Sequence, residues 1–208
     1  MWESYFGFKK TPFGDSPDGK QLFSSAAWQQ VHTRLGFLLQ HPGSGLITGE
    51  VGAGKSTAVR VFTAELNPNL FKILYVHFSS GSALDLLRQI ALRLDLEPAH
   101  SRGNLVRQIA DAVVRLNQSR KQHPILICDE AHLLPHAALE QLPLLLNFDM
   151  DSSRLLTLLL VGLQHCGVHC LCKCTRHYGN ALVFIITSKD SPATNSTLIW
   201  RSNSKQPV

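Results

Sequence analysis

One stretch of the chain limits its possible folds more than any other. Residues 49–56 read Gly-Glu-Val-Gly-Ala-Gly-Lys-Ser, which matches the pattern G-x-x-x-x-G-K-[ST] at every fixed position. The apolar run 45–48 before it is typical of a strand, and the run 57–62 after it is compatible with a helix. In that context the glycines let backbone N–H groups surround a polyphosphate, and the helix directs its positive end at the same anion. The stretch therefore predicts a nucleotide-binding loop.

The residue types of the loop assign roles to single side chains. We expect Lys55 to contact the β- and γ-phosphates of ATP and to act in catalysis, and the Ser56 hydroxyl to ligate Mg²⁺. A chance glycine-rich turn is the alternative, and the strand-loop-helix context disfavours it. The predicted nucleotide-binding residues are Gly49, Glu50, Val51, Gly52, Ala53, Gly54, Lys55, Ser56 and Thr57.

A second segment supplies acidic groups for the same metal. Residues 124–128 form an apolar run that Asp129 and Glu130 follow, as at the carboxyl end of a buried strand in a parallel sheet. We expect Asp129 to hold Mg²⁺ directly or through water, and Glu130 to orient and polarise the attacking water. Many strands end in acidic residues, so the pair is informative because it lies downstream of a phosphate loop. Residues 129–132 also spell the DEAH box of a helicase family, but that family needs two such domains and 208 residues are too few.

Strand-like runs alternate with helical patterns along the chain. This order predicts an α/β fold of the P-loop NTPase (AAA) type, a three-layer α/β/α domain with a mainly parallel sheet that binds nucleotide at the carboxyl ends of its strands. Strands are expected at 45–48, 71–78, 124–130 and 155–162. Helices are expected at 26–40, at 57–66, from Ser82, around 105–116 with Leu105, Ile109, Val113 and Leu116 on one face, and from 137 to about 147 with an interruption at Pro143. The predicted division is an N-terminal aromatic segment and helix (1–44), an ATPase core (45–162) and an atypical Cys-rich tail (163–208).

Composition restricts the partners and the compartment only loosely. The formal net charge of +5 permits a nucleic-acid partner without establishing one. Eighteen consecutive apolar residues occur nowhere, and the N-terminus lacks a basic region followed by an apolar core. We therefore expect a cytoplasmic protein with no membrane partner.

Several short segments between Trp2 and Gly162 form a combined signature. They are Tyr-Phe-Gly-Phe at 5–8, Thr-Pro-Phe at 11–13, and the segments 47–55, 128–134, 145–151 and 159–162. Together they resemble the ExeA/TniB-like AAA ATPases, most closely those encoded beside bacterial transposases. The resemblance implies an ATP- and Mg²⁺-dependent AAA domain that forms homo-oligomers, often on DNA, and helps to direct a transposase to its target. In the secretion branch the same domain assists assembly of an outer-membrane machine, which is the alternative function.

The family pattern ends at Leu163. Relatives continue with Gly-Gln-Pro-x-Leu-Arg, a helix, and a Gln-Arg-Ile/Leu strand that leads into a helical lid. Here residues 165–177 instead contain four cysteines and three histidines. A zinc site, an unrelated structured tail and a shifted reading frame are the competing explanations. The spacing C-x3-C-x-C-x-C argues against zinc, because structural sites use C-x2-C pairs.

The genetic code favours a shifted frame. When the codons of the tail are read from two nucleotides later, the codons from Leu163 onward permit the sequence Pro-Ala-Leu-Arg-Arg-Pro-Leu. The codons of residues 179–196 permit Gln-Arg-Leu, as in the family strand, followed by a sequence that resembles the start of the lid. We therefore hypothesise that residues 163–208 are frameshifted and end at a premature stop, so that the helical lid is missing or replaced. No sensor or arginine finger can then be assigned, and Gln164 is displaced by one residue from the sensor position. Such a truncated chain would bind ATP yet hydrolyse it poorly, or persist as a nucleotide-binding remnant. The apolar segment 181–187 could still pair as a strand.

Overall fold

A computed structural model describes residues 26–77, 81–142, 145, 154–163 and 182–185. Helices and strands alternate through these residues, as the sequence predicts. They are α2 (Ala26–Gln40), β1 (Ser44–Thr48), α3 (Lys55–Glu65), β2 (Phe71–His77), α4 (Ala83–Arg93), α5 (Arg102–Ser119), β3 (His123–Asp129), the short 3-10 helix η2 (Ala131–Leu133), α6 (His136–Gln141), β4 (Thr157–Gly162) and β5 (Leu182–Ile185).

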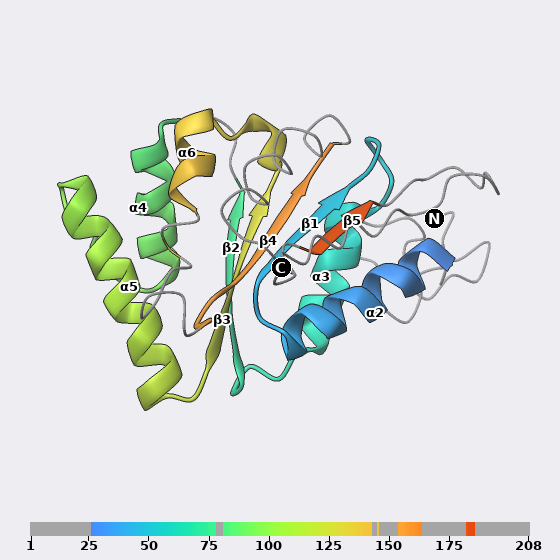
Figure 1. Cartoon of the computed structure of the whole chain (residues 1–208), viewed down its shortest axis with the longest axis horizontal. Helices are drawn as coiled ribbons and strands as arrows, with labels where there is room; N and C mark the ends of the chain where they lie inside the picture. Colours follow the sequence, from blue (N-terminus) through green and yellow to red (C-terminus); the bar gives the residue numbers. More distant parts are fainter. Residues whose placement is uncertain (1–25, 78–80, 143–144, 146–153, 164–181, 186–208) are drawn as a thin grey trace, which may run out of the picture.

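The strands of the described part form one parallel sheet in the order β2-β3-β4-β1-β5 (Figure 1). β4 lies between β1 and β3: Leu46 of β1 pairs with Leu160, and Leu160 also pairs with Cys128 of β3. The carboxyl ends of parallel strands lie at a common edge of the sheet. The loop after β1 and the carboxylates at the end of β3 therefore lie at the same edge, with the end of β4 between them.

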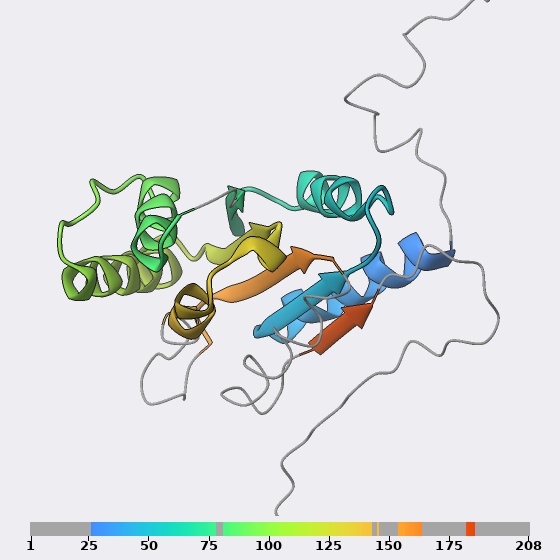
Figure 2. The same cartoon turned by 90° about the horizontal axis from the view of Figure 1, so that it is seen from above.

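Helices cover both faces of the sheet, which confirms the predicted three-layer α/β/α class. α2 and α3 lie on one face, and α4, α5 and α6 lie on the other (Figures 1 and 2). Side chains of a strand alternate between faces. Ile125 and Ile127 of β3 accordingly join the core beneath α2 and α3, whereas Leu126 and Cys128 join the core beneath α4, α5 and α6.

The helices bury the apolar positions that the 3.6-residue period selects. In α5 these are Leu105, Ile109, Val113 and Leu116, all as predicted. In α4 they are Leu86, Leu87, Ile90 and Ala91.

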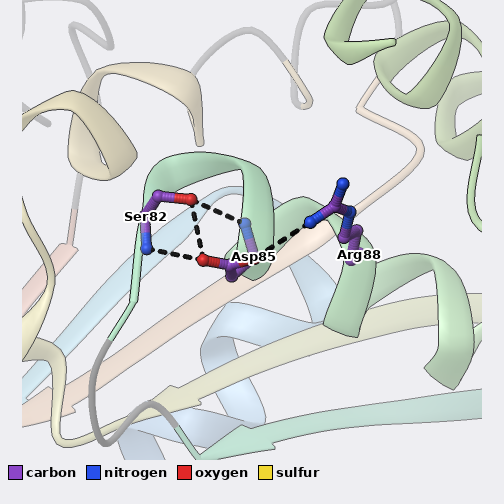
Figure 3. Close-up of polar contacts among 3 residues, drawn as sticks. All are labelled: Ser82, Asp85 and Arg88. Atoms are coloured by element: carbon purple, nitrogen blue, oxygen red, sulfur yellow. Dashed lines mark hydrogen bonds and ion pairs between the residues drawn. The ribbon is translucent and has the colours of Figure 1, made fainter. Parts of the chain in front are cut away.

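α4 begins with a reciprocal cap between Ser82 and Asp85 (Figure 3). The Ser82 Oγ accepts a hydrogen bond from the Asp85 N–H at 3.3 Å, and Asp85 Oδ2 accepts from the Ser82 N–H at 2.9 Å and from its hydroxyl at 2.8 Å. Arg88 Nη1 donates to Asp85 Oδ1 at 3.2 Å. The hydrogen bonds from Ser82, first that of its backbone N–H, lower the pKa of the Asp85 carboxyl. This cap fixes where the helix after β2 starts.

Several element boundaries differ from the prediction, among them those of β4 and α6. β4 begins at Thr157 and not at Leu155, because the Leu155 carbonyl accepts a hydrogen bond from Asn117 of α5 at 2.8 Å. α6 ends at Gln141, and its C-cap Leu142 still has helical backbone (φ −54°, ψ −41°). Pro143, where the prediction placed an interruption, lies outside the described residues.

The tail contributes β5, whose backbone pairs in parallel with β1 from Gly45 to Thr48. The predicted possibility that segment 181–187 pairs as a strand is thus confirmed for residues 182–185. The aromatic residues 5–13, the cysteines at 166–174 and Gln164 lie outside the described residues. Within the described ranges no helix has the length and apolar character needed to span a membrane.

Candidate functional site

The predicted nucleotide-binding loop joins the buried end of β1 to the first turn of α3. Its Gly52 and Gly54 have φ of 77° and 79°, in the left-handed region that glycine adopts without strain. No atom lies within 4 Å of where a Cβ would stand at either glycine, so backbone conformation and not crowding requires them. The Gly49 N–H donates to the Gly162 carbonyl at 3.3 Å, which ties the loop to the end of β4. The loop is therefore attached to the sheet at Gly49 and has free space beside Gly52 and Gly54.

The side chain of Lys55 folds back into this loop. Its Nζ donates to the Gly49 carbonyl at 3.1 Å and to the Glu50 carbonyl at 2.8 Å. The ammonium group thus lies beside the backbone of the loop, where a phosphate could take the place of these carbonyls as its partner.

The N-terminus of α3 opens toward the loop. Gly54 is its N-cap and provides no side-chain hydrogen bond, and the Ala58 N–H donates to the Gly54 carbonyl at 2.8 Å. The N–H groups of Lys55, Ser56 and Thr57 precede that bond and belong to the first turn, whose donors have no partner within the helix. An open glycine loop followed by such a turn fits a phosphate group.

Asp129 is held on both of its oxygens at the end of β3. It is 4% exposed, its Oδ1 accepts from the Glu130 N–H at 2.9 Å, and its Oδ2 accepts from the Tyr75 hydroxyl at 2.8 Å. Burial, and then the hydrogen bond to Asp129, raise the pKa of Tyr75 well above its ordinary value, so its hydroxyl stays a donor at neutral pH. The sequence analysis does not include Tyr75 among the site residues. Its position two residues before the end of β2 could have indicated it, because that strand end lies at the edge of the sheet that carries Asp129.

The extended backbone of β3 ends at Glu130. Its φ of 54° and ψ of 39° are left-handed, which is uncommon for a residue with a side chain. Its Oε2 lies 3.2 Å from His132 Nδ1, a distance typical of an ion pair, but the Nδ1 makes no hydrogen bond. The Glu130 side chain is 38% exposed, so water can approach its carboxylate.

The side chains of Ser56 and Asp129 fit Mg²⁺ in the kind of ligand atom that they offer. Ser56 offers a hydroxyl and Asp129 a carboxylate, the hard oxygen ligands that Mg²⁺ prefers. The described residues contain no cluster of three or more His, Cys, Asp or Glu that could hold a metal by itself. Mg²⁺ generally uses few protein ligands and completes its shell with phosphate oxygens and water.

A family comparison identifies the fold. The family described as "AAA domain" matches residues 38–166, which include the loop, Asp129 and Glu130. The chain belongs to the AAA domain family. The chain is 34% identical over 165 residues to the General secretion pathway protein A of Aeromonas hydrophila, and this stretch is 78% of the chain and 30% of that relative. The chain thus spans less than a third of the length of the relative.

Solved structures share the fold of this AAA domain at low identity. Cdc6p from Pyrobaculum aerophilum aligns with a TM-score of 0.56 and 18% identity, over 88% of this chain and 48% of its own. The Aeropyrum pernix ORC1 protein in complex with DNA has a TM-score of 0.58 and 18% identity, over 82% of this chain and 46% of its own. The ADP form of the Aeropyrum pernix ORC2 protein has a TM-score of 0.59 and 17% identity, over 84% and 51%. These likenesses confirm the predicted AAA fold class.

Proposed function

We propose that this AAA domain binds MgATP in the loop 49–57 and hydrolyses it. The observation that carries the proposal is the common sheet edge: the loop after β1 and the Asp129–Glu130 pair after β3 emerge on either side of β4. This is where open parallel sheets bind their ligands.

Each side chain has a distinct task in the proposal. Lys55 exchanges its contacts with the Gly49 and Glu50 carbonyls for phosphate oxygens. Ser56 and Asp129 hold Mg²⁺, which neutralises charge on the phosphates. Glu130 orients the attacking water from its exposed position beside His132.

The cellular role that we propose is ATP-dependent assistance of DNA transposition. Its support is the combined signature of segments between Trp2 and Gly162, which resembles ATPases encoded beside transposases. In this role the partners are a transposase, DNA and further copies of the chain in a homo-oligomer, and the compartment is the cytoplasm. Turnover that rises when DNA is added would support it.

A second candidate role is assembly of a secretion machine. The 34% identity to the General secretion pathway protein A of Aeromonas hydrophila favours it. A transposase gene beside the gene for this chain would favour the first role, and secretion genes in that place would favour the second.

The test measures ATP binding and turnover of the purified chain, with and without DNA. We expect Lys55→Ala to abolish binding and Glu130→Gln to keep binding while it abolishes turnover. Lys72→Ala is the matched control, because it removes a lysine that pairs with Asp95 away from the loop. Absence of binding in the unsubstituted chain would overturn the proposal, and binding without turnover would leave only the nucleotide-binding remnant.

A further inference from the structure

Tyr75 reaches the acidic end of β3 from the neighbouring strand. β2 and β3 pair in parallel, with Tyr75 opposite Ile127 and His77 opposite Asp129. Because side chains alternate along a strand, Tyr75, Ile127 and Asp129 share one face, and Tyr75 is the diagonal neighbour of Asp129. Ile127 packs in the core beneath α2 and α3, so this is the face that α3 covers. Tyr75 therefore approaches Asp129 on the side of the sheet where Lys55 and Ser56 begin their helix.

The two donors to Asp129 fix its carboxylate without using up its oxygens. Tyr75 occupies one lone pair of Oδ2 and the Glu130 N–H occupies one lone pair of Oδ1. Each carboxylate oxygen has a second lone pair. The plane of the carboxylate is thus defined at both ends while it can still accept a cation or a metal-bound water.

Packing in the core does not explain why position 75 is a tyrosine, because the residue is only partly buried. Its side chain is 39% exposed, whereas the adjacent Leu74 and Val76 are 0% and 1% exposed. The phenol ring therefore contributes little to the core, and the specific contact of this side chain is with Asp129. Removing the hydroxyl oxygen should leave the packing of β2 in place.

We infer that Tyr75 is a positioning residue whose hydroxyl holds the Asp129 carboxylate in the orientation that receives the Mg²⁺ of the bound nucleotide. The inference rests on the proposed function. Groups that orient a metal ligand typically change metal affinity 10- to 100-fold when they are removed. For Tyr75→Phe we expect the Mg²⁺ concentration that gives half-maximal tightening of nucleotide binding to rise by about 10- to 100-fold.

The experiment titrates Mg²⁺ into the full chain with a fluorescent ATP analogue that resists hydrolysis. The variants are Tyr75→Phe, Asp129→Asn and the double substitution, and affinity is also measured in EDTA. Lys72→Gln is the matched control, since it removes a side-chain contact of the same strand, at 3.0 Å to Asp95, far along β2 from the site. Thermal unfolding without nucleotide checks that each variant is folded.

We expect Tyr75→Phe to bind the analogue in EDTA with the same affinity as the unsubstituted chain, and to need more Mg²⁺ for tight binding. Combined with Asp129→Asn, it should cause no further loss of Mg²⁺-dependent affinity. Lys72→Gln should match the unsubstituted chain throughout. Normal Mg²⁺ dependence in Tyr75→Phe, or an equal loss when Tyr75→Phe is added to Asp129→Asn, would overturn the inference alone. Absence of analogue binding by the unsubstituted chain would overturn the proposed function and this inference together.

Discussion

At the residue scale, the turn into α3 depends on one backbone conformation. Gly54 has φ of 79°, and an L-residue in that region costs about 1–2 kcal/mol. We expect Gly54→Ala to lower the free energy of unfolding by about that amount, and to weaken ATP binding because the loop is displaced. Denaturant unfolding and nucleotide titration measure the two effects.

Gly36 provides a control of opposite sign. It lies inside α2, and no atom is within 4 Å of where its Cβ would stand. Gly36→Ala should raise the free energy of unfolding by about 0.5–1 kcal/mol, because alanine favours helix. If Gly54→Ala left the free energy of unfolding unchanged or raised it as Gly36→Ala does, left-handed strain at Gly54 would not be the reason for its glycine.

At the scale of elements, the cap of α4 includes a carboxylate and the cap of α5 does not, so only the first should depend on pH. Ser82→Ala removes a side-chain cap worth about 1 kcal/mol, together with the hydroxyl bond to Asp85. The pKa of Asp85 is depressed in the fold, so its contribution is present above the ordinary carboxyl pKa of 3.8 and is lost as pH falls below it. The destabilisation by Ser82→Ala should therefore shrink in acid.

Ser101 is the matched case, because it caps α5 through the Asn104 N–H and no carboxylate takes part. Ser101→Ala should cost a similar amount, about 1 kcal/mol, at neutral pH and in acid alike. Urea unfolding of both variants at neutral pH and well into the acid range tests this. Equal pH dependence of the two variants would contradict the assigned role of Asp85.

The sequence predicts the elements of this fold well because most of its signals are local. The apolar period finds the buried face of α5, and the glycine spacing finds the loop between β1 and α3. It misses the Tyr75–Asp129 contact, because the two residues are 54 positions apart and meet only through the register of β2 on β3. It also misplaces the start of β4, which a bond from α5 to Leu155 determines.

At the scale of the whole molecule, we expect the tail to affect whether the proposed site can complete catalysis. We propose that residues 163–208 derive from a shifted frame, and that the original frame encodes a lid. A chain rejoined to that frame after Gly162 should hydrolyse ATP faster by on the order of 10³ or more, if an arginine finger is restored with it. The gene sequence and a turnover assay test this. A shifted frame without lid-like sequence would end the hypothesis.

The place of β4 between β1 and β3 has a mechanical consequence. Adjacent strands lie about 4.8 Å apart, so the strands that carry the loop and the carboxylates are separated by about 10 Å. Side chains that reach a common ligand from both strands must close that gap over β4. A nucleotide with its metal would then add a link between the α3 side and the β2–β3 side of the continuous sheet while it is bound, and that link would be lost when the nucleotide leaves.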